Sequence, residues 1–247
     1  HEVWLDPEGF EIDTSDRLEV NIKNGEKLQG RSVPYIPNRI EKFFWSQNGE
    51  KIYVDSRLGD IPAFSEMIHK SGLISFVYVS KPSILNYKTL AKFEKFAQHK
   101  DLGPVREMHL NFGFPEQNFR ETYQRFAKAI VAVGPGTGND ANFGLITEFI
   151  LITNPYTSKN LKFLELRLNF EGKPRRNAQV EVFERAIDGK VSIFITRTSD
   201  EGIVVIPAKK GYEYLFDAVK LRSARPSAGQ TAVWETLWAA LMVKIPI

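Results

Sequence analysis

Short alternating segments separated by turn residues constrain the fold of this chain more than any other feature of its sequence. Segment 17–23 alternates apolar and polar side chains, as in a strand with one buried face. Segments 43–47 and 51–55 flank Asn48-Gly49, a pair that tolerates the positive φ angles of a two-residue hairpin turn. The pattern predicts a mainly β protein.

The second half of the chain has the same pattern at closer spacing. Its strand-like runs recur roughly every 8–12 residues, which is typical of an immunoglobulin-like sandwich. The runs are 161–170, 179–185, 192–196, 202–207, 212–221 and 232–245. Asn154-Pro155 interrupts the strand that precedes them. We therefore place a boundary there and predict two β-sandwich (immunoglobulin-like) domains, residues 1–155 and residues 156–247.

One short helix is expected in the N-terminal domain. Leu90, Phe93 and Phe96 follow one another at near-helical spacing, Asn86 can cap the helix, and Gly103-Pro104 ends it. Residues 108–119 show no regular pattern, and residues 121–133 resume as a strand whose later part is the most apolar.

Composition excludes several classes of function. The chain has 33 basic and 30 acidic residues and a net charge of +3, so nothing favours nucleic acid or an anionic membrane as partner. It has no cysteine, which excludes disulfides and thiolate metal ligands and fits an oxidising compartment. No apolar run approaches the ~20 residues of a transmembrane helix. Its opening is already strand-like, as in an exported protein after signal cleavage. We expect a periplasmic or secreted protein.

Four motifs in a fixed order resemble one bacterial protein family. They are His1-Glu2-Val3-Trp4-Leu5-Asp6-Pro7, then Glu121, Tyr123, Arg125 and Lys128, then Glu148 to Asn154-Pro155, then Trp234-Glu235-Thr236-Leu237-Trp238. The family is that of periplasmic nickel- or cobalt-uptake components, long described as a domain of unknown function. The resemblance implies a role in transition-metal uptake, with a membrane metal transporter as partner. The C-terminal half also resembles prealbumin-like and carboxypeptidase-regulatory β-sandwiches, through Gly172-Lys173-Pro174 and residues 178–182.

His1 is the strongest candidate for metal chemistry. As a first residue it offers its α-amine and its imidazole Nδ1 as a bidentate chelate, and such nitrogen donors suit Cu(II) or Ni(II). A second imidazole would complete the three-nitrogen arrangement called a histidine brace. We choose His109 as the partner and keep His69 as the alternative. His99 is expected at a helix C-terminus, where a protonated imidazole favours the helix dipole.

Glu121, Tyr123 and Arg125 alternate by two and therefore share one face of a strand, with Lys128 on the other face. This face either lines a site or holds a cross-face ion pair with the tyrosine hydroxyl anchored to it.

The sequence thus predicts a binding protein rather than an enzyme: a periplasmic accessory protein that holds copper or nickel through His1 and His109. No Gly-x-Ser-x-Gly motif and no cysteine support hydrolase chemistry. Two alternatives stay open. One is a histidine-brace copper oxidase that acts on polysaccharide, and the other is a metal-free surface adhesion or carbohydrate-binding module.

Overall fold

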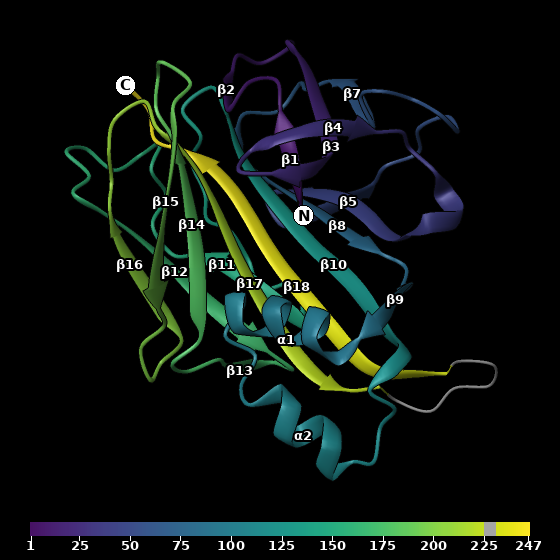
Figure 1. The fold of residues 1–247 in the computed structure, drawn as a ribbon. Helices are drawn as coiled ribbons and strands as arrows, with labels where there is room; N and C mark the ends of the chain where they lie inside the picture. Colours follow the sequence, from purple (N-terminus) through teal and green to yellow (C-terminus); the bar gives the residue numbers. More distant parts are fainter. Residues whose placement is uncertain (225–230) are drawn as a thin grey trace.

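A ten-stranded sheet runs through the whole molecule (Figure 1). The computed structural model describes residues 1–224 and 231–247. The sheet has the order β15-β14-β17-β18-β10-β8-β5-β6, and β2 and β9 pair with opposite ends of β10. Its strands are β2 Glu11–Ile12, β5 Ile40–Gln47, β6 Glu50–Tyr53, β8 Gly72–Ser80, β9 Ser83–Thr89, β10 Gln117–Val133, β14 Gln179–Arg185, β15 Val191–Arg197, β17 Glu213–Ser223 and β18 Ala232–Lys244. The predicted mainly β class is confirmed.

Two smaller sheets cover the two faces of the central sheet. The first contains β1 Glu2–Pro7, β3 Arg17–Glu26, β4 Gln29–Val33 and β7 Phe64–Met67. The second contains β11 Thr147–Leu151, β12 Phe163–Phe170, β13 Lys173–Pro174 and β16 Ile203–Pro207. Along β18, Ala240 and Met242 pack in the core under the first sheet, whereas Leu241 and Val243 pack in the core under the second. Neighbours in a strand point to opposite faces, so the two cores lie on opposite sides of the central sheet.

The central sheet joins the two halves of the chain through a parallel pair of strands. β10 pairs with β18 over residues 120–129, with Arg125 opposite Trp238. Strands from both sides of Asn154-Pro155 therefore share one hydrogen-bonded sheet, and the sheet has no break at that position. Both smaller sheets pack on this one central sheet. The division into residues 1–155 and residues 156–247 places strands of the same sheet in different domains.

Two helices lie near one end of β17 and β18 (Figure 1). They are α1 Leu90–His99 and α2 Val105–Asn111, and a short 3-10 helix, η1 Pro37–Arg39, lies elsewhere. Thr89 caps α1 by accepting a hydrogen bond from the Lys92 amide at 3.4 Å, while Asn86, the expected cap, lies in β9. α2 was not predicted: the sequence indicated one short helix, and α2 overlaps residues 108–119, which showed no regular pattern.

Aromatic stacking fixes α1 on the central sheet. Phe93 stacks on Trp234 with ring centroids 6.1 Å apart, and Phe96 stacks on Trp238 at 5.7 Å. Each such pair contributes about 0.5–1.5 kcal/mol beyond the area it buries. Trp234 and Trp238 lie in the same buried cluster as Phe93. Asn48 and Gly49 both have positive φ and form the turn between β5 and β6, as predicted. Within the described residues, no helix is both long and apolar enough to span a membrane.

Candidate functional site: an acidic cavity between the first sheet and helix α1

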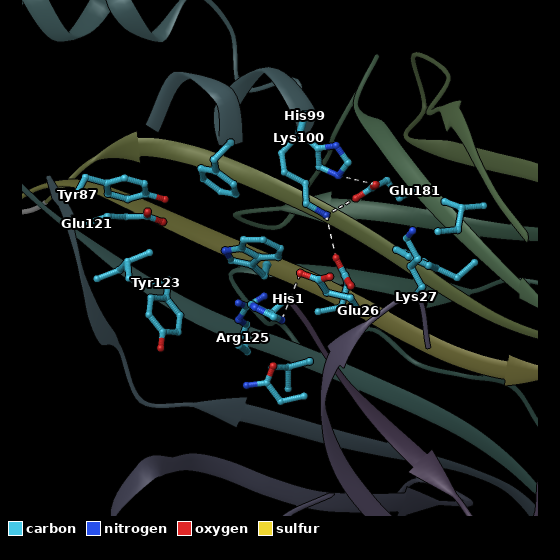
Figure 2. A pocket seen from close by; sticks show the side chains of 18 residues that line it. His1, Glu26, Lys27, Tyr87, His99, Lys100, Glu121, Tyr123, Arg125 and Glu181 are labelled. Atoms are coloured by element: carbon cyan, nitrogen blue, oxygen red, sulfur yellow. Dashed lines mark hydrogen bonds and ion pairs between the residues drawn. The ribbon is translucent and has the colours of Figure 1, made fainter. Parts of the chain in front are cut away.

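A cavity of about 540 Å³ lies between the first sheet, α1 and the central sheet (Figure 2). β1 and β3 provide one wall, the C-terminal end of α1 provides another, and β10, β14 and β18 provide the floor. Residues far apart in the sequence meet here: His1, His99, Arg125, Glu181 and Trp238 all line it. The volume lies within the range of small-molecule sites, about 300–1,000 Å³.

Three buried carboxylates form a cluster, of which two, Glu2 and Glu181, line this cavity. Glu2, Glu181 and Asp217 each offer an oxygen, and these oxygens lie within 4.8 Å of one another. The Lys100 ammonium lies among them: Nζ forms an ion pair with Glu181 and lies 3.4 Å from Glu2 Oε1 and 3.5 Å from Asp217 Oδ1. The charges of the cluster do not balance, because one ammonium faces three carboxylates.

Local structure brings these four residues together. Lys100 is the C-cap of α1, so its backbone leaves the helix and its side chain is directed at the sheet. Glu181 on β14 lies directly opposite Asp217 on β17 in the antiparallel register, so both side chains lie on the same face. Glu2 begins β1. Each carboxylate interrupts or flanks an otherwise apolar strand.

Burial and charge shift the pKa values of this cluster. Burial raises the pKa of Asp217 to about 6, although Lys100 lowers it. Burial disfavours the charged form of Lys100, but Asp217 and Glu181 outweigh burial and raise its pKa. Asp217 Oδ1 is buried and receives no hydrogen bond. The cluster therefore has negative charge that the described protein groups do not fully compensate, and it favours a further cation.

Two histidines border this cluster. His99 Nε2 lies 3.0 Å from Glu181 Oε1, although its side chain is 63% exposed. His1, at the rim, lies with Nδ1 3.5 Å from Glu26 Oε1. The sequence placed His99 at a helix C-terminus, which is where it lies, but it did not reveal that the imidazole reaches across to β14.

The two histidines chosen from the sequence as partners for His1 lie elsewhere. His109 is fully buried in α2, and neither it nor His69 lines the cavity. Trp234 Nε1 donates to His109 Nδ1 at 3.0 Å, and His109 Nε2 donates to the Pro115 carbonyl at 3.0 Å. Both ring nitrogens are thus occupied by protein partners. His69 lies 3.4 Å from Ser15 Oγ on the exposed surface. His1 and His99 line the same cavity, and the metal site stays a prediction.

Glu121, Tyr123 and Arg125 do share one face, and that face lines the cavity. Glu121 accepts a hydrogen bond from the Thr236 hydroxyl, and burial raises its pKa. Arg125 stacks on Trp238, with Cζ 3.8 Å from the ring centroid. Among the described residues, no carboxylate lies within ion-pair distance of Arg125, so the expected cross-face ion pair is not formed.

Lys128 points to the opposite face, as its position in the strand predicts. It lies fully buried with Nζ 2.8 Å from Asp140 Oδ2 and 3.1 Å from Glu148 Oε1. These contacts fasten the segment after β10 against the sheet and have no access to the cavity.

Sequence reasoning missed Lys100, Glu181 and Asp217 as site residues. A signal was present, because Glu181 lies within Val180-Glu181-Val182 and Asp217 follows Tyr214-Leu215-Phe216. A lone carboxylate inside an apolar strand needs a partner, since an isolated buried charge is strongly unfavourable. What the sequence could not provide was the pairing of β14 with β17, which brings the two together.

Comparison with known proteins gives a family but no function. The profile of a family described as "Domain of unknown function (DUF4198)" matches residues 1–221. No curated protein matches the chain. One similar solved structure is described as "Crystal structure of tetra-tandem repeat in extending region of large adhesion protein", with 9% identity and a TM-score of 0.24. That match covers 98% of this chain and 49% of the other, so the chain spans about half its length. A similarity this low carries no argument.

Proposed function

This chain belongs to the DUF4198 family, and we propose that it binds a divalent transition-metal ion in the acidic cavity and serves as an accessory protein in metal uptake or homeostasis. The observation that carries the proposal is the trio of buried carboxylates, Glu2, Glu181 and Asp217. Their oxygens converge within 4.8 Å of one another beside an imidazole. One of these oxygens, Asp217 Oδ1, has no hydrogen-bond donor.

The donor set indicates the kind of ion. Carboxylate oxygens from the trio and an imidazole nitrogen from His99 form a mixed N,O set with no sulfur, which suits Cu(II) or Ni(II). His1 lies at the cavity rim, where its ring can add a second nitrogen. The use of His1 and His99 replaces the pairing of His1 with His109, because both nitrogens of His109 are held by Trp234 and Pro115.

Lys100 gives the site a resident cation. Its ammonium lies among the same three carboxylates that would hold the metal, so the ion must displace it. Competition between Lys100 and the metal ion weakens metal binding. In the metal-free protein, however, the Lys100 ammonium compensates part of the negative charge of the three carboxylates. A carrier benefits from this balance, because it must release its ion to a partner such as a membrane transporter. An exported location follows from the family resemblance and is part of the proposal.

Titration calorimetry of metal-free protein with Cu(II), Ni(II), Co(II) and Zn(II) tests the proposal. We expect one equivalent to bind, and we expect Glu181→Gln to weaken binding at least tenfold, because it removes the carboxylate that His99 and Lys100 share. The matched control is Glu66→Gln, which changes an exposed glutamate outside the cavity. Equal affinities for the wild type and both variants would refute the proposed site.

A further inference from the structure

Arg125 lines the same cavity, and no ion pair joins it to the described carboxylates of the acid cluster. Its guanidinium lies over Trp238, with Cζ 3.8 Å from the ring centroid, and its Nε atom is buried without a hydrogen-bond partner. Burial lowers the pKa of Arg125, whereas Asp217 and Glu2 act at longer range to raise it. A half-buried guanidinium with free donors in a cavity is suited to binding a planar anion such as a carboxylate in a bidentate manner.

The size of the cavity exceeds what a bare ion needs. About six waters around an ion occupy roughly 180 Å³ at ~30 Å³ each, whereas the cavity measures about 540 Å³. Tyr87, Tyr123, Phe96 and Trp238 supply aromatic surface beside the polar groups. Apolar walls with a few placed polar groups are typical of sites for organic ligands.

The two polar ends of the cavity are separated by one strand. Arg125 lies opposite Trp238 on β18, and Asp217 lies opposite Ala240 on the other side of β18. Two strand spacings and an offset of two residues put the two Cα atoms about 12 Å apart. Arg125 and two members of the acid cluster, Glu2 and Glu181, line the same cavity, so a small organic molecule can contact both ends.

Charge decides what kind of molecule fits. Five carboxyl groups lie in this region, those of Glu2, Glu26, Glu121, Glu181 and Asp217, against the three cationic side chains of Lys27, Lys100 and Arg125. A free organic anion is repelled by this excess of negative charge. A ligand with a carboxylate at one end and a metal cation at the other matches both ends.

We propose that the cavity takes its metal as a complex with a small carboxylate-bearing chelator, whose carboxylate binds Arg125 while the metal lies at the acid cluster. The inference rests on the proposed metal binding and adds the class of ligand. Trp238 forms the platform on which the guanidinium is held, so a ligand bound to Arg125 also changes the surroundings of this tryptophan.

The test compares Ni(II) alone, citrate or L-histidine alone, and preformed Ni(II) complexes of each, by calorimetry and by tryptophan fluorescence. We expect a preformed complex to bind the wild type at least tenfold more tightly than Ni(II) alone. Arg125→Gln should remove this gain while leaving binding of Ni(II) alone intact or slightly stronger, since one cation is gone. Arg125→Lys should keep only part of the gain, because an ammonium cannot form the paired contact.

Controls separate the possible failures. Arg176→Gln changes an exposed arginine away from the cavity and should behave as the wild type. Near-ultraviolet circular dichroism checks that Arg125→Gln is folded. The inference is overturned if Ni(II) alone binds but no complex binds more tightly, or if Arg125→Gln keeps the full gain, and the proposed function then stands. Absence of binding in every form overturns both.

Discussion

Asp217 provides a direct test of the electrostatics of the cavity through the stability of the metal-free protein. Its carboxyl group is 3% exposed, and burial raises its pKa from 3.8 to about 6. Replacing it by asparagine keeps the size and removes the charge. We expect the Asp217→Asn variant to be more stable than the wild type at pH 8, which is unusual for the loss of an ion-pair partner.

The magnitude follows from linkage between proton binding and folding. The native state holds the Asp217 proton more tightly than the unfolded chain, so this group contributes its full stability below pH 3.8. That contribution is lost as the pH rises through about 6. A pKa difference of this size corresponds to about 3 kcal/mol, an upper value for the gain in the variant at pH 8. Lys100 keeps Glu181 and Glu2 as partners, so its charge stays compensated.

Urea unfolding between pH 4 and pH 8, with a chelator present, measures the difference between the variant and the wild type. The difference should be small near pH 4, should rise as the pH passes from 3.8 towards about 6, and should level off above about pH 6. Asp188→Asn is the control, because Asp188 is exposed and its hydrogen bonds with Lys190 lower its pKa, so no rise between pH 4 and pH 6 is expected. If the Asp217→Asn variant is less stable at every pH, the pair with Lys100 is net favourable and the reasoning is wrong.

Three further outcomes follow from the same contacts. Lys100→Met removes the cation that competes with the metal, so Ni(II) affinity by calorimetry should rise about tenfold, and unchanged or weaker binding would contradict the proposed displacement. His109→Ala leaves the Trp234 indole N–H without its acceptor and should lower the free energy of unfolding by about 1–3 kcal/mol. Its Ni(II) affinity should equal that of the wild type, and a loss of affinity would restore His109 as a ligand. Lys128→Met leaves Asp140 and Glu148 buried without a counter-charge and should cost about 3–5 kcal/mol in urea unfolding, with a smaller loss arguing for water access.

The sequence predicted the strands well because their signal is local. β14 and β18 begin where the alternation of apolar and polar residues said they would, at Gln179 and Ala232. α1 was predicted from the spacing of its aromatic residues, but α2 was not. The buried residues of α2 are Val105 and His109. Because one of them is polar, the sequence of α2 lacks the apolar spacing by which a helix is recognised.

The site was predicted only in part, because its geometry depends on long-range pairing. The shared face of Glu121 and Arg125 could be read from their spacing, and His1 does lie at the cavity. The convergence of Lys100 with Glu181 requires the end of α1 to meet a strand about 80 residues later. Nothing in the local pattern of either segment specifies that meeting, so His99 and Lys100 looked like ordinary residues at a helix end.

The central position of β18 has a consequence for how the chain acquires its shape. β18 separates β17 from β10, so strands made early in synthesis and strands made later are joined in one sheet only when residues 232–244 arrive. Sheets completed by such distant contacts form slowly, because the entropy of closing a long loop must be overcome first. A nascent chain from which β18 has not yet emerged would leave the facing edges of β17 and β10 unpaired, and chaperone protection during that interval is therefore expected to raise the yield of native protein.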